Sequence, residues 1–173
     1  KEDIIKADSH NVDFTIVTVH WGVEYKRFAN PEQKVIADFF VRNGVDAVIG
    51  SHPHVVQPID IYYNNDADST DISVVVYSLG NFVSNQRNRF RNGGIIFELE
   101  LMKTTTTRII DINYLPVWVH RRMIRFAQRD QRRSEYFIIP VDDYYDNPAN
   151  YGLTPEDSLA LKLFYDDTRE HLK

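Results

Sequence analysis

One strand–helix–strand unit constrains the fold of this chain more than any other feature of its sequence. Residues 13–19 and 46–49 are apolar, largely β-branched runs that are typical of buried strands. Between them, residues 31–43 predict an amphipathic helix whose start is marked by a capping box of Asn30 and Gln33. Such strands should be parallel neighbours joined by a right-handed crossover, so their carboxyl ends should share one edge of a sheet.

The second half of the sequence predicts short strands that pair antiparallel, followed by a helix at the end of the chain. The expected strands cover residues 58–63, 72–77, 95–101, 108–115 and 136–141. Residues 142–152 are expected to form a loop, and Thr154 opens a helix that runs towards the end of the sequence. The predicted fold class is therefore α/β, with a parallel βαβ unit followed by a β-rich, antiparallel half.

Composition excludes several kinds of protein and several kinds of site. The chain has 173 residues, 43% of them hydrophobic and 26% charged, which is typical of one folded globular domain and not of a disordered chain. It has no cysteine, so disulfides, cysteine nucleophiles and thiolate metal ligands are excluded. Any metal would need imidazole and oxygen ligands.

Three of the six histidines directly follow the two predicted parallel strands. His20 comes after the first strand, and His52 and His54 come after the second. We expect Pro53 to hold an extended backbone in which residues i and i+2 point the same way, so that all three imidazoles converge. Neutral imidazole binds divalent zinc, iron and manganese, and this edge is where α/β sheets bind ligands. The alternative is that each histidine only satisfies local packing or a backbone hydrogen bond.

Other polar residues near these segments are candidates for a role in the same site. Glu24 follows His20 by four residues and could be a ligand or an acid–base group, or simply a solvated carboxylate. Asn81 could present an amide oxygen at a strand end, although an asparagine after glycine is more often part of a turn. Gln57 could line the cleft or satisfy nearby backbone.

Arginines are concentrated in two places. Arg87, Arg89 and Arg91 lie in one loop, where they would bind an anionic ligand if the loop closes over the histidines; otherwise they are solvated. Residues 120–133 contain six arginines and one acidic residue in a chain of net charge −5. A solvated face is the favoured interpretation of that segment, with an anionic polymer or a membrane headgroup as the alternative.

Three segments, in order, resemble the bacterial capsule synthesis proteins of CapA type, which are associated with poly-γ-glutamate. They are His20–Tyr25, Gly50–Gln57 and Tyr77–Val83. That family is similar to the calcineurin-like metallophosphoesterases, which are layered α/β sandwiches with a two-metal site. The resemblance implies that residues 1–118 are the C-terminal half of such a domain, and that residues 119–173 add an arginine-rich segment and an acidic helical tail. The family's early aspartate and asparagine motifs have no counterpart here and are expected before Lys1.

The positions of these residues, together with the resemblance, imply roles for them and a place of action. His20, His52 and His54 would hold a divalent metal (Mn, Zn or Fe), with His20, Glu24 and His54 as catalytic groups. The substrate-binding residues would be Gln57, Asn81, Arg87 and Arg89. The full protein would be a metal-dependent hydrolase at the extracytoplasmic cell envelope, acting on or handling poly-γ-glutamate or a phosphorylated glycan. The isolated piece is expected to bind metal weakly and to be inactive.

Two questions stay open at this point. The protein could instead be a non-catalytic component that binds the polymer or assembles a synthesis complex. A partner is expected along the open edge of strand 13–19 or strand 46–49, supplied by the N-terminal half or by another copy. Nucleic acid is not an expected partner.

Overall fold

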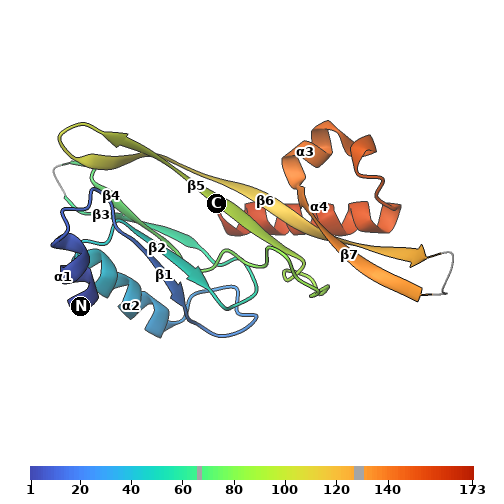
Figure 1. The fold of residues 1–173 in the computed structure, drawn as a ribbon, viewed down its shortest axis with the longest axis horizontal. Helices are drawn as coiled ribbons and strands as arrows, with labels where there is room; N and C mark the ends of the chain where they lie inside the picture. The colour runs from blue at the N-terminus through green and yellow to red at the C-terminus, as the bar shows by residue number, and fades with distance from the viewer. Residues whose placement is uncertain (66–67, 127–130) are drawn as a thin grey trace.

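The computed structural model of the chain describes residues 1–65, 68–126 and 131–173. Its first half contains α1 (Glu2–Asp8), β1 (Ile16–His20), α2 (Pro31–Arg42), β2 (Ala47–Ser51), β3 (Ile59–Tyr63) and β4 (Ile72–Val76). Its second half contains β5 (Gly93–Lys103), β6 (Thr107–Phe126), β7 (Gln131–Pro140), α3 (Val141–Asp146), the 3-10 turn η1 (Pro148–Asn150) and α4 (Pro155–His171). Figure 1 shows these elements in place.

A four-stranded sheet in the order β1-β2-β4-β3 forms the first half of the fold. Strands β1, β2 and β4 are parallel, and β3 pairs antiparallel with β4. The expected βαβ unit is confirmed, since α2 connects β1 to β2 and starts with the predicted capping box of Asn30 and Gln33. The register pairs His20 with Ser51, so the two histidine segments leave the sheet at one edge.

A second sheet, in the order β5-β6-β7, is entirely antiparallel. The 20-residue strand β6 pairs with β5 along its first part and with β7 along its second part. The arginine-rich segment therefore forms strand on both sides of residues 127–130, which lie outside the described residues. The boundary expected at residues 118 and 119 falls inside β6, whose pairing is continuous there.

The two sheets and the helices pack in layers, as Figure 1 shows. Side chains of α2 cover one face of the first sheet in a core that includes Ala37, Val48 and Tyr77. The other face of that sheet packs against the second sheet through Val74 and Ile109. These contacts bury the β-branched residues of β2 and β4 from both sides, as parallel strands require.

The helices at the end of the chain pack on the far part of the second sheet. Trp118 of β6 lies in a buried cluster with Leu161 and Phe164 of α4. The expected loop at residues 142–152 was wrong in part, because Val141 is fully buried and the residues after it form α3 and η1. None of the helices in the described ranges combines the length and apolar character needed to span a membrane.

Candidate functional site

Three histidine side chains meet at the carboxyl ends of β1 and β2. The ring centroids of His20 and His52 lie 4.6 Å apart, and those of His52 and His54 lie 6.4 Å apart. Because β1 and β2 are parallel and in register, the crossover through α2 brings together residues that are more than 30 positions apart. The metal-ligand role of these histidines stays a prediction.

The backbone that carries His52 and His54 is left-handed, so the expectation of an extended segment was wrong. His52 has a φ of 104° and His54 a φ of 59°. Non-glycine residues seldom adopt such angles, and they cluster at functional sites where the surrounding structure holds them in place. The two rings thus approach each other through a tight turn, not through the period of a strand.

Gly50 allows the strand before this turn to pack closely against its neighbours. A Cβ atom on Gly50 would lie 2.1 Å from the carbonyl oxygen of Tyr77 and 2.5 Å from Nε1 of Trp21. Trp21 Nε1 donates a hydrogen bond of 2.8 Å to that same carbonyl oxygen. A glycine is therefore required where the indole of Trp21 crosses β2 to reach Tyr77, directly after β4.

Asn81 fixes the tautomer of His54. The Asn81 amide nitrogen donates to the carbonyl oxygens of Arg91 (2.8 Å) and His54 (3.3 Å), so its oxygen faces the His54 ring. That oxygen lies 2.8 Å from His54 Nδ1, which must therefore be the donor. A neutral His54 then has its lone pair on Nε2, as a metal ligand or a general base requires.

Glu24 and Tyr25 lie beside the free nitrogen of His54. The carboxylate of Glu24 is 3.9 Å from His54 Nε2, and the two side chains are 49% and 37% exposed. The Tyr25 ring stacks on His54 at 6.1 Å, and the guanidinium of Arg91 lies 3.4 Å from the centre of the Tyr25 ring. Two acceptors that face each other in this way suit a proton or a cation between them.

Three of the predicted substrate-binding residues are engaged elsewhere. Gln57 is fully buried and donates to the carbonyl oxygens of Lys26 and Phe28. Arg87 donates to the carbonyl oxygens of Val119 and Ser84, at 2.6 and 2.9 Å. Arg89 forms a two-pronged ion pair with Asp167 of α4, at 2.7 and 2.8 Å.

Sequence reasoning underrated the third arginine of this loop, Arg91, which contacts the histidine cluster through Tyr25. No pattern in the sequence distinguishes the role of Arg91 from the roles of Arg87 and Arg89, because all three lie in an irregular loop. The difference arises because Arg87 and Arg89 are bound by residues of β6 and α4, which are distant in sequence.

The donor chemistry at this edge fits a divalent metal, although its geometry is incomplete. Three imidazoles and one carboxylate are nitrogen and oxygen donors of the kind that Zn, Mn and Fe accept. Within residues 1–65, 68–126 and 131–173, however, no three His, Asp or Glu side chains are arranged so that they could hold one ion. His20 Nδ1 lies 3.4 Å from the hydroxyl of Ser51, which leaves its Nε2 for a ligand.

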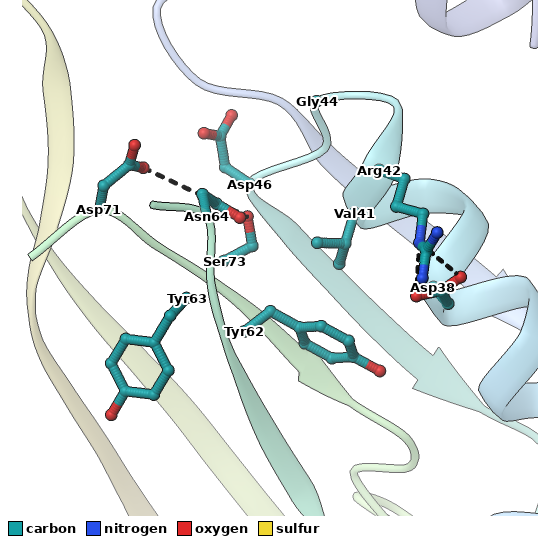
Figure 2. Close-up of a pocket in the computed structure, with 10 residues that line it drawn as sticks. All are labelled: Asp38, Val41, Arg42, Gly44, Asp46, Tyr62, Tyr63, Asn64, Asp71 and Ser73. Atoms are coloured by element: carbon teal, nitrogen blue, oxygen red, sulfur yellow. Dashed lines mark hydrogen bonds and ion pairs between the residues drawn. The ribbon is translucent and has the colours of Figure 1, made fainter. Parts of the chain in front are cut away.

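A cavity of about 570 Å³ lies at the opposite end of the first sheet, and no histidine lines it. Figure 2 shows its lining, in which Asp38 pairs with Arg42 and Asp71 bonds to Asn64. Burial raises the pKa of Asp46 in this cavity, against the opposing effect of the hydrogen bond from the Thr15 backbone. The cavity lies at the amino ends of β2 and β4, away from the edge where ligands bind to α/β sheets.

The chain is similar to proteins of capsule and polyglutamate synthesis. The family model of the bacterial capsule synthesis protein PGA_cap matches residues 1–86. A PGA biosynthesis protein CapA of Bacillus subtilis is 31% identical over 172 residues, which is 98% of this chain and 40% of that relative. A capsule biosynthesis protein CapA of Bacillus anthracis is 40% identical over 76 residues, or 44% of this chain and 16% of the relative.

A more distant match extends the same relationship to another organism. A "probable polyglutamine synthesis accessory protein" of Mycobacterium tuberculosis is 27% identical over 132 residues, covering 73% of this chain and 33% of the relative. The chain thus spans less than half the length of each of these relatives. The matched residues 1–86 contain all three histidines of the sheet edge and Asn81, and the chain belongs to the CapA-type family of bacterial capsule synthesis proteins.

Proposed function

We propose that this chain supplies the imidazole side of a divalent-metal hydrolase site in a protein of capsule or poly-γ-glutamate synthesis. The observation that carries the proposal is the fixed tautomer of His54, whose Nε2 lone pair faces Glu24 at 3.9 Å. A protonated His54 would only form an exposed ion pair with Glu24, whereas the neutral ring presents the free Nε2 lone pair that a metal ligand requires. A site that binds a cation needs that arrangement.

The names of the relatives support an anionic polymer as the substrate. They are called proteins of PGA biosynthesis and of capsule biosynthesis, and we extend that role to the protein that contains this chain. The site of action would then be the extracytoplasmic face of the cell envelope. Arg91, held over Tyr25 next to His54, would neutralise a carboxylate or phosphate of the polymer at the histidine edge.

The residues of this chain would divide the chemistry between binding and proton transfer. His20, His52 and His54 would hold the metal, which when bound would polarise the scissile group and lower the pKa of water. Glu24 would take up or release a proton beside the reacting bond. The described residues do not form a three-ligand group by themselves, so we propose that carboxylates from elsewhere in the full protein complete the site.

The test uses the full-length protein, loaded in turn with Mn²⁺, Zn²⁺ and Fe²⁺. Metal content is measured by elemental analysis, and hydrolysis is measured with an aryl phosphodiester and with poly-γ-glutamate. We expect His52→Ala and His54→Ala to lose bound metal and activity. His10→Ala is the matched control, because it replaces an exposed histidine after α1. This variant should keep both its bound metal and its activity.

Two results would overturn the proposal. Metal content at the wild-type level in both His52→Ala and His54→Ala would show that these histidines are not ligands. Polymer binding by the metal-loaded wild type without any hydrolysis would replace the hydrolase with the alternative, a non-catalytic binding component.

A further inference from the structure

We infer that Asp167 of α4 is a positioning residue for the histidine edge. It holds together the two loops, residues 21–30 and 77–92, that bring Tyr25 and Arg91 to that edge. The role of Arg91 in binding an anion rests on the proposed function. The positioning itself rests on contacts between α4 and the two loops.

Asp167 binds both loops from the last turns of α4. Its carboxylate accepts two hydrogen bonds from Arg89, of 2.8 Å from Nε and 2.7 Å from a terminal nitrogen. Its backbone carbonyl oxygen accepts a third, of 3.0 Å, from Arg27. The Asp167 side chain is only 12% exposed, so water screens this two-pronged pair less than it screens an ordinary surface pair. Helix α4 runs back towards the first sheet, which places its last turns at these loops (Figure 1).

The ring of Phe90 lies beside both of the arginines that Asp167 binds. The guanidinium carbon of Arg27 is 4.2 Å from the centre of this ring, and that of Arg89 is 4.9 Å from it. Burial lowers the pKa of Arg27, the charge of Asp167 opposes this effect, and the charge of Arg89 adds to it. Asp167 is therefore the main charge that allows two guanidinium groups to share one aromatic ring.

Each loop contains a residue with a left-handed backbone close to these contacts. Phe90 has a φ of 71° and Tyr25 has a φ of 67°. Such angles are unfavourable for residues other than glycine, and they persist where contacts on several sides hold the residue. Phe90 separates Arg89 from Arg91 in the sequence, so its turn determines where Arg91 points once Arg89 is fixed.

The two loops meet a second time at the histidine edge. The guanidinium of Arg91 lies 3.4 Å from the centre of the Tyr25 ring, which stacks on His54. One cation–π contact at a partly exposed ring is too weak to maintain two left-handed residues by itself. The geometry at His54 therefore depends on the second attachment, which Asp167 supplies through Arg89.

Hydrogen exchange of the full-length protein, followed by mass spectrometry, tests the positioning without an activity assay. Asp167→Asn should raise the exchange rates of protected amides in both loops about tenfold and leave those of β6 unchanged. Arg89→Gln, which breaks the same ion pair from its exposed side, should have the same effect, and the double variant should add nothing further. Asp166→Asn is the matched control, because it makes the same change one residue earlier and breaks an exposed ion pair with Lys162.

Steady-state kinetics of the full-length, metal-loaded protein with the aryl phosphodiester test whether the positioning serves the histidine edge. Asp167→Asn should raise KM about tenfold, as expected when one charge-assisted contact to the substrate is lost. Its kcat and metal content should stay close to those of the wild type. A residue needed only for stability would instead lower the fraction of active protein, and with it kcat, at unchanged KM. Asp166→Asn should match the wild type in KM and kcat.

The outcomes separate this inference from the proposed function. Equal exchange rates in Asp167→Asn and Asp166→Asn would overturn the positioning. A fall in kcat and metal content at unchanged KM would overturn the link to Arg91, because the effect would then lie on the metal ligands. If the wild type does not hydrolyse the phosphodiester, the proposed function fails, and the exchange comparison alone still supports or overturns the role of Asp167.

Discussion

The side chains of Gln33 and Gln57 are joined by a hydrogen bond of 2.8 Å in the interior of the protein, where they are 1% and 0% exposed. Gln33 also accepts from the Asn30 backbone at the start of α2. Gln57 donates to Lys26 and Phe28 in the segment between β1 and α2. One buried amide network therefore holds the segment that carries Glu24 and Tyr25 against the histidine edge.

Replacing Gln57 with leucine should destabilise the protein through that network. Gln57→Leu leaves two carbonyl oxygens and the Gln33 amide without partners, so we expect the free energy of unfolding to fall by about 2–3 kcal/mol. Urea denaturation measures the change. Glu32→Gln, on the exposed side of α2, is the control and should stay within about 0.5 kcal/mol of the wild type. A Gln57→Leu protein as stable as this control would contradict the assignment.

A side chain at position 50 should disrupt the histidine edge. Gly50→Ala places a methyl group 2.1 Å from the Tyr77 carbonyl oxygen and against Trp21 Nε1, so we expect a loss of at least about 2 kcal/mol. Gly44→Ala is the contrast, because no atom lies within 4 Å of its added Cβ and only its φ of 82° is unfavourable. That variant should lose about 1 kcal/mol. Thermal unfolding of both compares the costs, and equal losses would rule out the steric explanation.

His171 should make stability depend on pH. It bonds to the carbonyl oxygen of Arg27, and burial lowers its pKa, with Arg27 lowering it further against the effect of that bond. The unfolded chain then takes up a proton first as the pH falls. Stability should therefore be retained above the unfolded-state pKa of about 6.5 and be lost as the pH falls through the lower folded-state pKa.

Denaturation midpoints between pH 7.5 and pH 5.5 measure this dependence. His171→Gln can keep a donor for the Arg27 carbonyl oxygen but does not titrate, so its midpoint should change less than that of the wild type. His10→Gln replaces an exposed histidine, so its denaturation midpoint should change with pH as that of the wild type does. Identical pH profiles for His171→Gln and the wild type would refute the role of His171.

The isolated chain of residues 1–173 should associate through β1. This strand pairs with β2 on one side, and no strand of the described residues pairs with its other side. Ile16, at its start, is 56% exposed, and such an edge is a template for another strand. Light scattering should show species larger than one chain, and Ile16→Lys should reduce them. A monomer whose β1 amides exchange rapidly with solvent would contradict this expectation.

The same isolated chain should be a poor enzyme. Its described side chains provide no three-ligand metal group, so hydrolysis of an aryl phosphodiester with Mn²⁺ should be no faster than with His52→Ala. A steady-state assay of both proteins at equal concentration measures the difference. Robust turnover by the isolated chain that is lost in His52→Ala would show that no further ligands are needed.

The parts of the fold that could be predicted are those determined by residues close together in the sequence. The capping box of Asn30 and Gln33 and the two β-branched runs determine the βαβ unit, and that unit places His20 beside His52. The left-handed angles of His52 and His54 were not predictable, because the residue before a proline ordinarily adopts an extended conformation.

Contacts between distant segments account for the remaining differences. The ion pair of Arg89 and Asp167 joins residues 78 positions apart, so nothing near Arg89 indicates that its charge is already used. The length of β6 was underestimated because its arginines interrupt the apolar pattern at His120 and beyond. Pairing with β7 keeps the strand regular where its own sequence is polar.

The continuity of β6 makes the packing of α4 depend on the number of residues in that strand. Successive side chains of a strand alternate between its faces, so inserting one residue near Pro116 would turn every later side chain of β6 to the opposite face. Trp118 would leave the α4 cluster, while β5 and the histidine edge would keep their places. An insertion within β6 is therefore expected to preserve the α4 packing only if it adds two residues or is accommodated by a β-bulge, as the register shift at Glu100 and Leu101 already is.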